Sequence, residues 1–83
     1  MNSELKNNEK FRILFGENLK KIRKSKNLSF RKLAQRCDVD HANLNKIEKG
    51  TINISMNTIY EISKGLDIQP KELFDFEIKY DID

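Results

Sequence analysis

The feature that most constrains the fold is a pair of short amphipathic segments between positions 28 and 50, separated by only a few residues. Apolar residues recur at helical spacing in both, as Phe30, Leu33 and Ala34 in the first and as Leu44 and Ile47 in the second. Ser29 and Asp40 stand directly before the two segments, and both are residue types that favour the N-cap of a helix. Gly50 is suited to end the second segment. The pattern predicts two short helices, the second over about residues 41–49, joined by a tight connection at residues 37–39.

Three further helices are expected around this pair. From about residue 9 to residue 26, apolar side chains recur every three or four residues, at Phe11, Phe15, Leu19 and Ile22. Ser55 can cap a helix whose inward face carries Ile59, Ile62, Ser63 and Leu66. Pro70 suits the first position of a short fifth helix, with Gln69 as its cap. The sequence therefore predicts an all-α, five-helix domain over residues 9–74, preceded by a flexible tail at residues 1–8.

The C-terminal segment, residues 75–83, changes period. Apolar side chains alternate with charged ones from Phe74 onwards, which is typical of a β-strand with one apolar face. No other segment offers this strand a partner, so the same segment of a second subunit is the expected one. On this hypothesis the dimer contacts are Phe76, Ile78 and Tyr80. The alternative is that these residues pack back onto the helical core or extend the fifth helix.

Composition excludes several classes of protein. At 83 residues the chain fits one domain, and it has neither an apolar run of 18 residues nor the apolar stretch of a secretory signal. A cytoplasmic protein without a membrane contact is therefore expected. One cysteine, one histidine and no glycine-rich phosphate loop leave no basis for a metal site, a cofactor or an enzymatic activity.

Charge is distributed unevenly along the chain. Residues 1–53 hold 13 Lys and Arg against 6 Asp and Glu, a net charge of +7, whereas residues 54–83 hold 3 against 7, a net charge of −4. Such a dipolar chain suits a protein that turns one basic face towards phosphates. A solvated mixed surface is the alternative interpretation of the charges taken alone.

The segment LSFRKLAQRCDVDHANLNKIEKG, Leu28 to Gly50, resembles the helix-turn-helix of the Cro-like phage repressor family, also called the XRE family. The resemblance extends from Phe15 to Phe74, because IRKSKNLS precedes the motif and NTIYEISKGLDIQPKELF is similar to the last two helices of the family. It implies a lambda-repressor-like fold that binds DNA.

Three positions depart from the family pattern. Phe30 stands where the family often has a glutamine that touches the DNA backbone, so that contact is expected to be lost. Asp38 replaces a usual glycine in the turn, where aspartate can take a positive φ at lower cost than most residues. Ile54 replaces a common proline, and neither of these last two changes threatens the fold.

The resemblance also implies the roles of individual residues. The first part of the second motif helix would face base edges in the major groove, with contacts from His41, Ala42, Asn45 and Lys46. Phosphates would be contacted by Ser29, Asn43, Lys49, Thr51 and Asn53. In the family, a glutamate at the position of Glu48 pairs with an arginine of the first helix, which here is Arg23, and we expect a structural ion pair.

The function predicted from the sequence is that of a sequence-specific, DNA-binding transcriptional regulator. It would bind double-stranded DNA, in an inverted-repeat operator, as a homodimer. Small autoregulatory repressors and restriction–modification controller proteins are the types of similar size. The alternative is an antitoxin-like or other protein-interaction module that uses the same fold and holds a protein partner.

Overall fold

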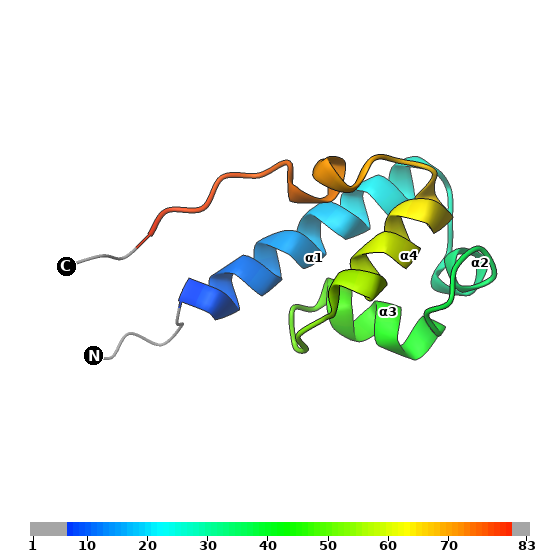
Figure 1. Cartoon of the computed structure of the whole chain (residues 1–83), viewed down its shortest axis with the longest axis horizontal. Coiled ribbons are helices and arrows are strands. Elements are labelled where there is room, and N and C mark those ends of the chain that lie inside the picture. The colour runs from blue at the N-terminus through cyan, green and yellow to red at the C-terminus, as the bar shows by residue number, and fades with distance from the viewer. Residues whose placement is uncertain (1–6, 81–83) are drawn as a thin grey trace.

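The computed structural model describes residues 7–80, which form a bundle of short helices around one core (Figure 1). Helix α1 spans Asn7–Ser25, α2 Phe30–Ala34, α3 His41–Glu48 and α4 Met56–Leu66. The fifth predicted helix, Pro70–Phe74, is a 3₁₀-helix, η1. The prediction of five α-helices is thus corrected to four and one 3₁₀ turn, because five residues after Pro70 are too few for α-helical hydrogen bonds to extend. Helix α1 begins two residues before its expected start.

Local side-chain hydrogen bonds fix where the helices begin. The hydroxyl of Ser29 accepts a hydrogen bond from the backbone amide of Lys32 at 3.0 Å. The hydroxyl of Ser55 accepts one from the backbone amide of Thr58 at 3.1 Å. Asn27 takes a positive φ of 58° after α1, as its residue type allows, and Gly50 does so at 74° after α3. The caps at Ser29, Gly50 and Ser55 were predicted from the sequence, since each depends on a residue within four positions of the helix end.

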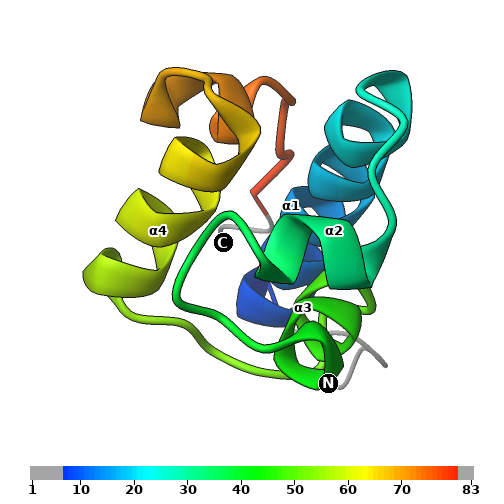
Figure 2. The same cartoon turned by 90° about the vertical axis from the view of Figure 1, so that its right-hand side faces the viewer.

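The core is shared by all five helical segments: α1 contacts α3 and η1, α2 contacts α3 and α4, and α4 contacts η1. Its eight buried apolar side chains are Phe15, Leu19, Leu33, Leu44, Ile47, Ile62, Leu66 and Leu73. Every helix contributes at least one of them, so no single helix can bury its apolar face without the others. Figure 2 shows the helices from the side of α2 and α3. These two helices lie next to each other, and α4 lies on the opposite side of the view.

Two glycines of the helices allow close approach. A Cβ on Gly16 of α1 would lie 2.3 Å from the carbonyl oxygen of Glu48, so α1 passes directly against the end of α3. A Cβ on Gly65 of α4 would meet side-chain atoms of Leu33 and Cys37 at 3.0 and 3.1 Å. The contact at Gly16 joins residues more than 30 positions apart along the chain, so no local pattern in the sequence points to it.

The predicted C-terminal β-strand is wrong for the residues that the structure describes. Residues 75–80 form no strand, and they run as an extended segment beside the N-terminal half of α1 (Figure 1). The ring of Phe76 packs with those of Phe11 and Phe74, at centroid distances of 5.8 and 6.5 Å. An alternating pattern suits any extended chain with one covered face, and here a helix covers it. Residues 81–83, the end of the proposed strand, lie outside the described residues.

Among residues 7–80, no helix is both long enough and apolar enough to cross a membrane.

Candidate nucleic-acid interface

Helices α2 and α3 form the unit that the sequence motif predicted. Leu33 of α2 and Leu44 of α3 are completely buried, so the two helices share the core through their inward faces. The carboxylate of Asp40 accepts a hydrogen bond from the backbone amide of Asn43 at 2.8 Å, and this bond caps α3 at its N-terminus. An N-terminal cap of this kind sets the first turn of α3 firmly at the molecular surface.

The outward face of α3 carries the four residues expected to contact bases. His41, Ala42 and Lys46 are exposed, and Asn45 is half-buried. Leu44, Ile47 and Glu48 point the other way and are buried. Helical spacing places the two sets on opposite faces of α3, so the core residues and the residues available to a ligand are different ones. The outward set offers hydrogen-bond donors, acceptors and one methyl group, which are the groups that read base edges.

The five residues expected to contact phosphates are all exposed, but they differ in how they are held. Ser29 and Asn43 lie at the caps of α2 and α3. Lys49 follows α3 and forms no ion pair with a carboxylate among residues 7–80. The hydroxyl of Thr51 donates to the carbonyl of Lys46 at 3.1 Å, which fixes the loop after α3. Ser29 and Asn43 thus lie at the N-terminal ends of α2 and α3, and the other three lie at the end of α3 and in the loop that follows it.

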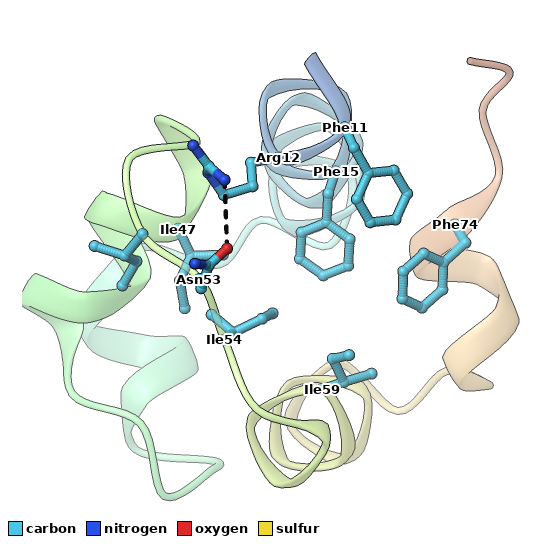
Figure 3. Close-up of a pocket in the computed structure, with 9 residues that line it drawn as sticks. Phe11, Arg12, Phe15, Ile47, Asn53, Ile54, Ile59 and Phe74 are labelled. Carbon is cyan, nitrogen blue, oxygen red and sulfur yellow. Dashed lines mark hydrogen bonds between the residues drawn. The ribbon is translucent and has the colours of Figure 1, made fainter. Parts of the chain in front are cut away.

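Arg12 was not predicted, and it organises the loop that holds Asn53. Its Nε donates to the carbonyl of Gly50 at 3.2 Å, and its Nη1 donates to Oδ1 of Asn53 at 3.4 Å (Figure 3). The partners are 38 and 41 residues away along the chain, so no local pattern points to them. Because Arg12 occupies the amide oxygen of Asn53, the amide nitrogen is the group left to donate to a phosphate.

Arg23 and Glu48 form the ion pair expected from the resemblance. Two hydrogen bonds join them, from Nε to Oε2 at 2.6 Å and from Nη2 to Oε1 at 3.1 Å. A third guanidinium bond goes to the carbonyl of Leu28 at 2.6 Å. The ring of Phe30 covers the guanidinium, whose carbon lies 4.1 Å from the ring centroid. The pair joins α1 to α3, and the ring of Phe30 packs against one face of the guanidinium.

The turn between α2 and α3 is held by α4 and not by a positive φ at Asp38. Asn27 and Asp67 are the non-glycine residues with positive φ in the described part of the chain, so the expectation for Asp38 is wrong. Its amide instead donates to Oε1 of Glu61 at 2.8 Å, and Lys64 contacts the same oxygen at 3.1 Å. The Asp38 amide, and after it Lys64, hold the pKa of Glu61 below its usual range.

Cys37 lies half-buried in this same turn. Its thiol donates to the carbonyl of Leu33 at 3.4 Å, and burial raises its pKa. A raised pKa disfavours the reactive thiolate at neutral pH, so the turn presents an unreactive cysteine.

Comparison with known proteins agrees with this geometry. A family model described as "Helix-turn-helix" matches residues 19–73. The control protein C.BamHI of Bacillus amyloliquefaciens is 48% identical over 66 residues, which are 78% of this chain and 82% of that protein.

Two solved structures of restriction–modification controller proteins have the same fold. C.AhdI of Aeromonas hydrophila superimposes with a TM-score of 0.73 at 35% identity, over 75% of this chain and 94% of that one. C.Esp1396I, solved as a tetramer with its natural 35-base-pair operator, superimposes with a TM-score of 0.72 at 25% identity, over 78% and 86%. The resemblance to Cro-like, XRE-type repressors is thereby confirmed. The chain belongs to the helix-turn-helix family, and it is a homologue of the control protein C.BamHI.

Proposed function

We propose that this protein is a transcriptional regulator that acts in the cytoplasm on double-stranded DNA, binding an inverted-repeat operator as a homodimer. Helix α3 enters the major groove and reads base edges through His41, Ala42, Asn45 and Lys46. The phosphate contacts come from Ser29, Asn43, Lys49, Thr51 and Asn53, which fix the position of α3 and carry no base preference. The protein needs no cofactor for this role.

The observation that carries this proposal is the polar, outward face of α3, rigidly held by the core behind it. Leu44 is fully buried and Ile47 is 3% exposed, so α3 cannot rotate without exposing the core. The ammonium group of Lys46 can donate hydrogen bonds to O6 and N7 of guanine, and the amide of Asn45 can form two hydrogen bonds with adenine. The two solved controller proteins have the same fold, one of them was solved on operator DNA, and the control protein C.BamHI is similar in sequence. They support assigning this chain to restriction–modification control.

We place the dimer contact on an apolar surface that runs along α1, α4 and the C-terminal segment. A hollow of about 140 Å³ opens between α1 and α4 (Figure 3), lined by Phe11, Ile54, Ile59 and Phe74 among others. Phe11 also lines a second hollow, with Ile78 and Tyr80. A monomer that leaves both hollows open to water exposes apolar area which a second copy can cover.

Of the three residues first proposed for this contact, Ile78 and Tyr80 line the second hollow, and Phe76 packs against Phe11, which lines both hollows. Tyr80 is 64% exposed and Phe11 is 41% exposed, so both are accessible to a second copy. The contact is therefore one of side chains packed between helices and extended segments, without the strand pairing that the sequence suggested.

The experiment that tests the function is selection of binding sites from a random pool of DNA duplexes at near-physiological salt. The expected result is enrichment of an inverted repeat whose half-sites lie about one helical turn, roughly 34 Å, apart. Enrichment of a single half-site would contradict the homodimer. No enrichment, together with a tightly co-purifying protein, would favour the alternative of an antitoxin-like or other protein-interaction module.

Sedimentation of an Ile78→Asp variant tests the dimer surface. A buried aspartate without a partner destabilises an apolar contact, so the variant is expected to sediment as a monomer at concentrations where the unmodified protein is a dimer. Lys71→Asp places the same side chain on the exposed surface of η1 and is the matched control. A dimer that survives Ile78→Asp but dissociates with Ile54→Asp would confine the contact to the hollow between α1 and α4.

A further inference from the structure

The C-terminal half of α1 carries two lysines whose place in the fold neither the motif nor the predicted contacts explain. Lys20 and Lys24 are one helical turn apart, and both are exposed. They line a hollow of about 290 Å³ between α1, α2 and α3, together with Phe30, Asn45 and Lys49 among others. We call this place the basic hollow. It begins at the edge of the α3 face that the proposed function assigns to DNA.

The charges inside the basic hollow do not cancel. Arg23 and Glu48 also line it, but their charges offset one another in a buried ion pair. Lys20, Lys24 and Lys49 remain, so four positive and one negative side chain give a net charge of +3. No carboxylate of residues 7–80 lies within ion-pair distance of these three lysines. The hollow therefore holds three cationic groups that attract an anion from outside the chain.

Arg23 is already engaged within the protein. Three of its five N–H groups donate to protein oxygens, and the ring of Phe30 covers one face of the guanidinium. Phe30 itself has no hydrogen-bond donor, and it stands at a position where the family often has glutamine against the DNA backbone. The ammonium groups that line the hollow are those of Lys20, Lys24 and Lys49, and they are its charged groups outside the Arg23–Glu48 ion pair.

We propose that Lys20 and Lys24 of α1 join Lys49 in holding the DNA backbone, with the phosphates at the basic hollow. The contact takes the place of the hydrogen bond that Phe30 cannot make. This proposal rests on the proposed function, because it requires α3 in the groove and the hollow beside a strand. In Figure 2, α2, α3 and the C-terminal end of α1 occupy one side of the molecule, and η1 lies on the other. A duplex bound along α3 therefore passes the hollow and not η1.

The test is the salt dependence of DNA binding by a Lys20→Gln, Lys24→Gln double variant. Fluorescence anisotropy is measured on the selected operator and on an unrelated duplex of equal length, between 50 and 200 mM salt. Each phosphate contact contributes about 0.9 to the slope of log K against log salt, and a bound dimer loses two contacts in each of its subunits, so the slope falls by about 3.6. The affinity lost over this fourfold range is then smaller than that of the unmodified protein by about 150-fold.

The matched control is Lys71→Gln, which removes one exposed positive charge on η1 and is expected to leave the slope unchanged. The effect of the double variant should be the same on both duplexes, because phosphate contacts carry no sequence information. An unchanged slope, or a loss confined to the operator, would overturn the proposal while leaving the regulator function intact. If the unmodified protein itself showed no salt-dependent binding to either duplex, the proposed function would fail first. An unchanged urea midpoint verifies that the variants are folded.

Discussion

Replacing Glu48 by glutamine removes the negative partner of a buried charge, and we expect it to destabilise the fold more than any surface change. The side chains of Arg23 and Glu48 are 8% and 4% exposed. In Glu48→Gln, the amide oxygen can accept one of the two bonds from Arg23, while the guanidinium stays charged and buried. Removing one partner of a buried pair costs about 3 to 5 kcal/mol, and the retained bond places this variant near 3 kcal/mol.

That loss is large for a chain of this size. At about 0.05 to 0.15 kcal/mol per residue, 83 residues correspond to a free energy of unfolding of about 4 to 12 kcal/mol. Urea denaturation followed by circular dichroism measures the change. With an m-value of about 1 to 3 kcal/mol per molar urea, the midpoint is expected to fall by at least about 1 M.

A double variant separates the charge from the contact. Arg23→Met with Glu48→Leu leaves no charge buried, so its stability should return to within about 1 kcal/mol of the unmodified protein or exceed it. The reasoning is refuted if Glu48→Gln costs less than about 1 kcal/mol, or if the double variant is as unstable as the single one. The first result would mean that water reaches the pair, and the second that packing and not charge is the cause.

Three further predictions follow from the same structure. Gly16→Ala forces a methyl group against the end of α3 and is expected to cost about 1 to 2 kcal/mol in urea denaturation despite the better helix propensity of alanine, whereas Gly65→Ala, which meets side-chain atoms, should cost less than about 1 kcal/mol. The lowered pKa of Glu61 means that its bond to the turn stabilises the fold above the ordinary glutamate pKa and is lost as pH falls through the depressed value. Unfolding measured against pH should therefore show a smaller acid loss in Glu61→Gln. Lys46→Ala should relax the preference at one base position of each half-site in a repeated site selection, while Lys49→Ala should weaken binding to all duplexes alike and reduce the salt slope by about 1 for each subunit bound.

The sequence alone determined the helices and the motif. Helix starts at Ser29, Asp40 and Ser55 depend on hydrogen bonds that reach only three residues along the chain, so the residue types announce them. The spacing of the apolar residues also separated the buried face of α3 from its outward face, because residues three or four positions apart lie on the same side of a helix. The roles of the base-contacting residues came from the resemblance to the Cro-like family, and the residues that it names lie on that outward face.

Only the tertiary structure decided the contacts between residues distant in the chain. Arg12 reaches Gly50 and Asn53, and Glu61 holds the amide of Asp38, across separations that no local pattern encodes. The C-terminal segment shows the physical reason most clearly. Alternation specifies an extended chain with one covered face, but what covers it is a matter of which apolar surface lies nearby. Here the rings of Phe11 and Phe74 are already in place beside Phe76, so packing against α1 satisfies the pattern that a second strand would otherwise satisfy.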